Sequence, residues 1–172
     1  EIKTTTRTTS SHAIHGVHQI EPTLASDDAT GEARLLLVSI GLCQADITAP
    51  ALSIPSLVES ILDRLNATGA SGLVDEFLTH VSVYGAESGI GYEHATMVNE
   101  APFTTTFNVN FVRGYDMVDP AIEVLRRNDV VTHQHVDAQS VTFRVDLPAT
   151  ISLNNPIVGT KRVVETILSP HS

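Results

Sequence analysis

The sequence predicts an α+β fold, a single domain dominated by antiparallel β-sheet, sandwich- or barrel-like, with two to three short helices. Thr and Val contribute 19 residues each to the 172, and β-branched residues favour strands over helices. Several segments alternate apolar and polar residues with a period of two, whereas few show the helical period. With 42% hydrophobic and 17% charged residues, the chain has enough apolar side chains to form a core.

The first segment predicts an extended N-terminal arm over residues 1–11, followed by a single α+β domain over residues 12–172. The arm is rich in Thr, and Ile2 is its only sizeable apolar residue. Such a segment buries little surface of its own, so ordering its backbone requires hydrogen bonds to a sheet edge. That edge belongs either to the same chain or to a neighbouring copy.

Three helices are predicted. The clearest runs over residues 54–66, with Ser53 as its N-cap, Pro55 in the first turn and Gly69 at its end. Its apolar residues recur at helical spacing, at Ile54, Leu57, Val58, Ile61, Leu62 and Leu65. Two further helices are expected over 72–79, followed by a strand from Val81, and over 119–127, beginning at Asp119-Pro120.

The predicted strands span residues 13–20, 32–42, 104–112, 130–137 and 141–147. Residues 161–168 suit a helix by spacing and a strand by their β-branched content. The core is expected where Leu57, Ile61 and Leu65 pack on a sheet. The sheet residues of that core are Phe107, Phe111, Phe143 and Val145.

Composition excludes several functional classes. The chain has 10 Lys and Arg against 20 Asp and Glu, a net charge of −10, so no nucleic-acid surface is expected. Its longest run of large apolar residues is four, at 35–38, so no membrane-spanning segment or membrane partner is expected. The one cysteine, Cys43, follows a mostly apolar stretch and is expected to be a buried small hydrophobic residue.

Histidine is the only enriched reactive residue type, with 8 in the chain. If residues 130–137 form a strand, His133 and His135 project from the same face, and Asp137 shares that face. Two imidazoles and a carboxylate are ligands that a divalent metal such as zinc accepts. An exposed polar strand face is the alternative interpretation. His12, His15 and His18 recur every third residue, and an extended chain would split them between two faces.

Two functions remain. The first is a non-catalytic structural subunit of a homo-oligomeric assembly, with a virion capsid or tail protein as one example. It needs no cofactor, and its partners are copies of itself, in a virion or in the cytoplasm. The alternative is a small metal-dependent enzyme or ligand-binding domain that uses the His-x-His pair. No complete catalytic motif is present, so the sequence favours a protein that is not an enzyme.

Overall fold

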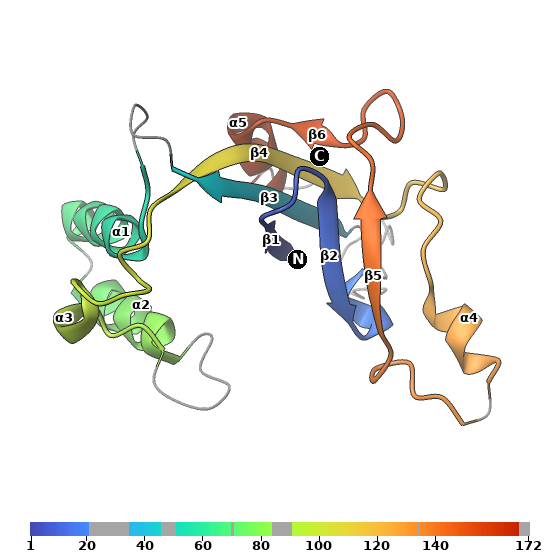
Figure 1. The fold of residues 1–172 in the computed structure, drawn as a ribbon, viewed down its shortest axis with the longest axis horizontal. Coiled ribbons are helices and arrows are strands. Elements are labelled where there is room, and N and C mark those ends of the chain that lie inside the picture. Colours follow the sequence, from blue (N-terminus) through green and yellow to red (C-terminus); the bar gives the residue numbers. More distant parts are fainter. Residues whose placement is uncertain (21–34, 46–50, 70, 84–90, 134, 169–172) are drawn as a thin grey trace. The chain divides into compact units, whose positions relative to one another are not determined.

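The computed structural model describes residues 1–20, 35–45, 51–69, 71–83, 91–133 and 135–168. Figure 1 shows two sheets and several short helices. The strands are β1 (Ile2–Thr5), β2 (Ser10–His15), β3 (Leu36–Gln44), β4 (Phe107–Asp116), β5 (Thr142–Leu147) and β6 (Ile157–Val158). The helices are α1 (Ile54–Thr68), α2 (Ser71–Val83), α3 (His94–Met97), α4 (Arg127–Val131) and α5 (Thr160–Leu168), with a 3₁₀ turn, η1, at Val17–Gln19.

The strands form a four-stranded sheet in the order β1-β3-β4-β6 and a two-stranded sheet of β2 and β5. β1 runs parallel to β3, whereas β6 and β5 run antiparallel to β4 and β2. The predicted α+β class with a dominant sheet is therefore confirmed. The larger sheet is mixed and, over the described residues, does not close into a barrel. Five α-helices are described, against two to three predicted.

Contacts divide the chain into two compact units. The first combines residues 1–43 with 109–172, and the second contains residues 44–108. Both sheets belong mainly to the first unit, and α1, α2 and α3 belong to the second. One domain over residues 12–172 stays a prediction.

The N-terminal segment is paired with its own chain. Ile2 lies opposite Val38 and Thr5 opposite Gly41 in the parallel pairing of β1 with β3. β2 begins at Ser10, so the predicted boundary after residue 11 falls inside a strand. Of the two expected partners, the sheet edge of the same chain is the one that the segment uses.

The core of the first unit lies where its two sheets meet. It contains Ile14, Ile20, Leu37, Tyr115, Met117, Ile122, Val145 and Leu147. Strands β2, β3, β4 and β5 provide Ile14, Leu37, Tyr115, Val145 and Leu147, so apolar side chains of both sheets share one cluster. Ile20, Met117 and Ile122 join the cluster from outside the strands. The buried Tyr115 hydroxyl lies 2.8 Å from Ser10 Oγ and 2.8 Å from the Pro148 carbonyl oxygen. These two hydrogen bonds allow a phenol to be buried completely.

Gly41 of β3 packs directly against the aromatic ring of Phe111 on β4. A Cβ atom added to Gly41 would overlap the ring of Phe111. On that same ring, the Arg113 guanidinium carbon lies 4.1 Å from the ring centroid. The ring therefore occupies the space that a side chain at position 41 would need, and it also takes part in a cation–π contact.

Helix α1 follows its sequence signals. Ser53 Oγ accepts a hydrogen bond from Ser56 N, Pro55 lies in the first turn, and Gly69 ends the helix at φ 73°. The predicted burial is wrong at Ile61, which is 40% exposed, whereas Val58 is 5% exposed. The helix packs on α2. Helix α2 itself continues through Val83, so no strand begins at Val81.

Two other predicted elements differ from the structure. Residues 119–126 are not helical, because the Asp119 carboxylate accepts hydrogen bonds from Ala121 N, Ser152 Oγ and Asn155 Nδ2 at 2.9, 2.9 and 3.1 Å. That carboxylate ties the segment to a distant turn instead of capping a helix.

The predicted strand over 130–137 is wrong as well. Helix α4 occupies 127–131, and Asp129 Oδ2 accepts a hydrogen bond from Arg126 N at 2.8 Å. The 161–168 segment is helical, in α5. None of the described helices is long and apolar enough to cross a membrane.

Candidate functional site

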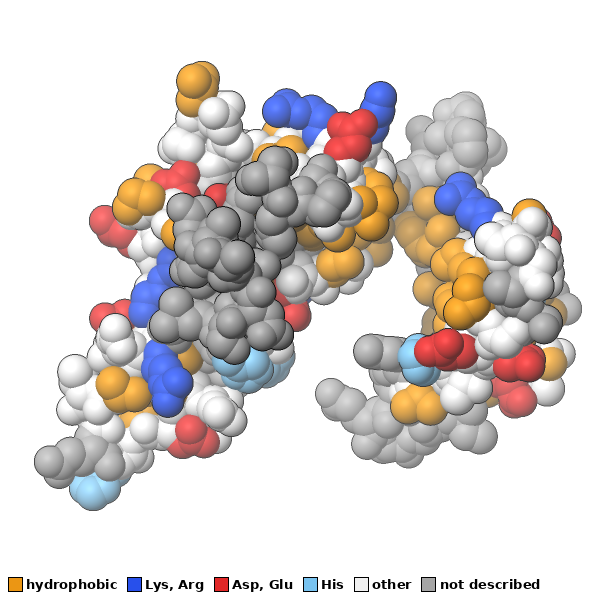
Figure 2. Space-filling model, turned by 180° about the vertical axis from the view of Figure 1, so that it is seen from behind, with side chains coloured by type: hydrophobic (Ala, Val, Ile, Leu, Met, Phe, Trp, Pro, Cys, Tyr) orange, Lys and Arg blue, Asp and Glu red, His pale blue; other side chains and the backbone are white. Residues whose placement is uncertain are grey.

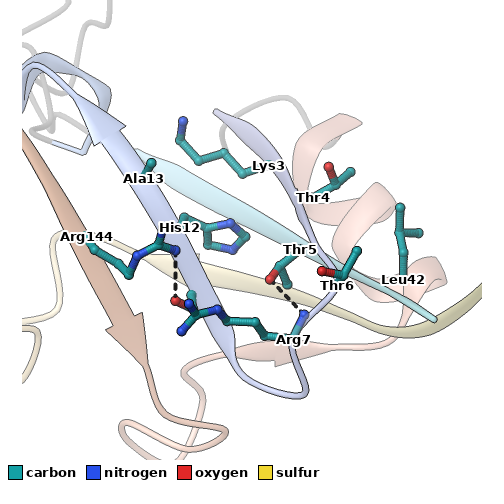
Figure 3. Close-up of a pocket in the computed structure, with 10 residues that line it drawn as sticks. Lys3, Thr4, Thr5, Thr6, Arg7, His12, Ala13, Leu42 and Arg144 are labelled. Carbon is teal, nitrogen blue, oxygen red and sulfur yellow. Dashed lines mark hydrogen bonds between the residues drawn. The ribbon is translucent and has the colours of Figure 1, made fainter.

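The candidate site is a pocket of about 530 Å³ in the first unit, lined mainly by basic and hydroxyl side chains. It is lined by Lys3, Thr4, Thr5, Thr6, Arg7, Ser11, His12, Ala13, Leu42 and Arg144 (Figure 3). We call this the cationic pocket. Its lining contains three basic side chains, four hydroxyls, one imidazole and no carboxylate.

Four strands and a turn bring these residues together, with Leu42 coming from β3. β1 provides Lys3, the turn after it provides Arg7, and β2 provides Ser11 and His12. Arg144 arrives from far along the sequence because β5 pairs with β2, which places it opposite Ala13. Its Nη1 donates a hydrogen bond to Ser11 Oγ at 3.3 Å. Figure 3 shows this bond as a dashed line, with the Arg7 side chain extending from the turn toward it.

His12 forms the floor of the pocket and links its strands. The side chain is 3% exposed, and its Nε2 lies 2.7 Å from Ser39 Oγ on β3. Burial lowers the pKa of His12, and the positive charges of Lys3 and Arg144 lower it further. A hydrogen bond to the Thr4 backbone and the charge of Asp146 oppose this shift without reversing it. The imidazole is therefore neutral near pH 7 and acts as a hydrogen-bonding link.

Two acidic groups lie near the pocket without lining it. Glu1 Oε1 is 3.5 Å from Lys3 Nζ, and Asp146 lies on β5 two residues after Arg144. The Lys3–Glu1 pair, with side chains 15 and 34% exposed, balances one positive charge of the lining, and Arg7 and Arg144 add two more. The pocket therefore keeps a positive field within an acidic protein.

The structure places the predicted metal ligands differently from the expectation. His133 and His135 lie in the turns after α4 instead of on a strand, so no common strand face orients them. The Asp137 carboxylate accepts hydrogen bonds from Ser140 Oγ at 2.7 Å and Gln139 N at 3.0 Å. Both bonds lower the pKa of Asp137, and the bond from Ser140 has the larger effect.

Asp137 therefore stabilises its own turn. Within the described ranges, no three His, Cys, Asp or Glu side chains are grouped so that they could hold a metal ion. The zinc alternative at His133, His135 and Asp137 loses the strand geometry that suggested it.

Two other sequence expectations concern histidine and cysteine. As expected for an extended chain, His12 is buried and His15 is exposed on the opposite face of β2. His18 lies in η1 and shares no strand face with His12. Cys43 is exposed near the end of β3, so the expectation of a buried cysteine is wrong.

Sequence reasoning did not find the cationic pocket. Lys3 and Arg7 stand in the Thr-rich segment that the sequence assigned to an arm, and Arg144 is more than 130 residues away in the chain. One available signal was charge. The first twelve residues contain two of the ten Lys and Arg residues, together with a histidine and several hydroxyls.

A second feature of the first unit is an open groove beside β5. It has a volume of about 510 Å³ and lies between residues 121–125 and 143–151. Its lining is mixed. The apolar members are Ile122, Val124, Leu125, Phe143, Leu147 and Ile151, and the charged members are Glu123, Arg144 and Asp146. Among the described residues, β5 pairs with β2 alone, so the side of β5 away from β2 has no strand partner. We call this side the β5 edge.

Comparisons with known proteins add no relative. A scan against protein-family models, a search of curated proteins and a search of solved structures each give no match to this chain.

Proposed function

We propose that the chain is a non-catalytic structural subunit that assembles with copies of itself. The observation that supports this proposal is the β5 edge with the open groove beside it. An unpaired strand edge presents backbone donors and acceptors that a strand of another chain satisfies. Pairing there would also remove the apolar part of the groove lining from water.

The sequence of β5 favours a second copy as the partner. β5 reads Thr142-Phe143-Arg144-Val145-Asp146-Leu147. In an antiparallel pairing of two copies centred on Val145, Arg144 lies opposite the second copy's Asp146, and Phe143 opposite its Leu147. Both charged contacts are attractive and the apolar residues meet each other, which are the favourable combinations for cross-strand neighbours. A two-fold axis makes every such contact occur twice.

Exposed apolar side chains provide further support. In the first unit, Val164, Ile167 and Leu168 of α5 are exposed by 43, 50 and 73%. In the second unit, Ile61, Leu73 and Val83 are exposed. Figure 2 shows hydrophobic side chains at the surface of both units on the face that it draws. Residues 164, 167 and 168 share one face of α5 by helical spacing, and grouped apolar surface of this kind is typical of proteins that associate.

A charge swap on β5 tests the proposal. Arg144→Asp places two acidic groups opposite each other in the dimer, and Asp146→Arg places two basic groups there. Each variant is expected to weaken self-association by about tenfold or more, because like charges directly opposite each other are destabilising. The double variant restores opposite charges and is expected to restore self-association. Light scattering after size exclusion should give a mass of twice 18.5 kDa for the wild type.

Arg162→Asp on α5 is the matched control, since it makes the same charge change at another exposed site. A wild type that keeps the mass of one chain at every concentration would contradict the proposal. Loss of association in both single variants without recovery in the double variant would reject this pairing of β5. A narrower role as a capsid or tail protein of a virion stays a prediction.

The second candidate is a ligand-binding domain. It is favoured by the cationic pocket and not by the His-x-His pair on which the sequence based it. The two candidate surfaces share Arg144, which lines the cationic pocket and belongs to β5, whereas Lys3 and Arg7 belong to the pocket alone.

A further inference from the structure

We propose that the cationic pocket binds a small molecule through a phosphate or sulfate group. The lining offers Lys3, Arg7 and Arg144 as positive donors and contains no carboxylate. Arg144 also belongs to the β5 edge, so the variants that test this inference are made at Lys3 and Arg7, which do not.

The donor types match an oxyanion. Guanidinium and ammonium groups only donate hydrogen bonds, and bonds from them to anionic oxygens are stronger than those between neutral groups. Around them stand the hydroxyls of Thr4, Thr5, Thr6 and Ser11. A hydroxyl turns its hydrogen toward whichever acceptor is near, so these groups complete the shell that oxygen atoms of an anion need.

The concentration of positive charge is unusual for this chain. Three of its ten Lys and Arg residues line one pocket, although the net charge is −10. With twice as many acidic as basic side chains, basic residues distributed over the surface would mostly have acidic neighbours. Grouping like charges costs energy unless an anion balances them, and a cleft lined by one sign of charge raises the local concentration of counter-ions.

The walls of the pocket are fixed before any ligand arrives. His12 on β2 contacts Ser39 on β3 at 2.7 Å, and β1 pairs with β3 along its length. Thr5 is buried, and its Oγ1 accepts a hydrogen bond from Arg7 N at 3.1 Å, which shapes the turn that carries Arg7. A site whose donors are held in place loses less entropy on binding.

The size of the pocket indicates what the anion is attached to. A volume of about 530 Å³ exceeds that of one inorganic oxyanion and lies within the range of small-molecule sites. Leu42 and Ala13 add a short apolar wall beside the polar donors. A phosphomonoester of a small polyol or sugar therefore fits the lining better than free phosphate does.

Calorimetric titration of the full chain tests the proposal, with ionic strength held constant by chloride. The probes are inorganic phosphate, inorganic sulfate, glycerol phosphate, ribose 5-phosphate and uncharged ribose. Saturable binding of the phosphate-bearing probes is expected, with no binding of ribose. Tighter binding of the monoesters would assign the site to a phosphorylated small molecule, and equal binding would assign it to a free oxyanion. Both results support an oxyanion site.

The variants locate the binding. Arg7→Gln and Lys3→Gln are each expected to weaken phosphate binding by about tenfold or more, because each removes a charged donor. Arg7→Lys retains the charge and should bind within a few-fold of the wild type. Arg64→Gln makes the same charge change on α1 outside the pocket lining and should bind like the wild type.

Two results would overturn the proposal. One is the absence of saturable binding for every anionic probe. The other is binding that Arg7→Gln, Lys3→Gln and Arg64→Gln reduce equally, since that pattern describes general screening of an acidic protein. Circular dichroism of each variant checks that the fold is kept, and Arg7→Lys provides the comparison if Arg7→Gln does not fold.

Discussion

At the scale of single residues, His12 has the largest number of structural roles. Its ring hydrogen-bonds to Ser39 and to the backbone of Thr4, so one side chain on β2 joins β1 and β3. Protonation would place a charge in a buried position beside Lys3 and Arg144. The ring is therefore a point at which acid should act on the fold.

The first prediction concerns this effect of pH. Because the pKa of His12 is lowered in the folded protein, the unfolded chain binds its proton more readily, and stability falls as the pH decreases. The stabilisation that comes from neutral His12 should be complete above about pH 6.5, the ordinary pKa of histidine, and should be lost as the pH falls below that value. Urea denaturation between pH 7.5 and 5.5 measures it.

His12→Gln should reduce this dependence on pH and lower stability at pH 7.5 by about 1–3 kcal/mol, the range for disrupting buried hydrogen bonds. The matched control is His15→Gln, which removes an exposed histidine from the other face of β2. A His12→Gln variant with the wild-type dependence on pH would show that the buried imidazole does not cause it.

At the scale of elements, local signals explain which helices the sequence could predict. Helix α1 has a cap, a first-turn proline and a left-handed glycine within its own sequence. Helix α4 has no such pattern in its apolar residues. It begins where the Arg126 guanidinium donates to the carbonyl oxygens of Ile20 and Met117 at 2.8 and 2.7 Å. The contact with Ile20, 106 residues away in the chain, is invisible to periodicity.

The second prediction compares two side chains of α1. Val58 is 5% exposed and Ile61 is 40% exposed. Val58→Ala should therefore lower the free energy of unfolding by about 1–3 kcal/mol, whereas Ile61→Ala should lower it by less than about 1 kcal/mol. This order is expected although isoleucine loses more atoms. Urea denaturation gives both values, and a larger loss at Ile61 would show that the position is covered in solution.

At the scale of the whole molecule, the class of fold and the strands β4 and β5 followed from alternation, whereas β1, β6 and the site did not. Phe107, Val109 and Phe111 share a period of two that fits β4, and Phe143 with Val145 does the same in β5. The cationic pocket depends on which strands become neighbours. Nothing in the alternation of β2 or β5 indicates that Arg144 lies beside Ser11.

The third prediction concerns residues 1–9. The sequence predicted residues 1–11 as an arm that pairs with a sheet edge of its own chain or of a neighbouring copy, and in the structure β1 is an edge strand of its own sheet with Thr5 buried. Deleting residues 1–9 should therefore remove the cooperative thermal transition of the first unit or lower its midpoint by several degrees. Near-ultraviolet circular dichroism and light scattering follow the fold and the mass. A truncated chain that keeps its thermal transition but forms a smaller oligomer would support the interpretation of this segment as an arm that binds a neighbouring copy.

The contact of Gly41 with the Phe111 ring has a consequence for the evolution of this sequence. A side chain at position 41 requires a smaller residue at position 111, and a smaller residue at 111 leaves a gap over the glycine backbone and removes the partner of Arg113. Each single change is unfavourable, so the two positions should vary together among descendants of a common ancestor. A candidate relative that has diverged almost everywhere could then be tested at two aligned columns, one from each of these strands.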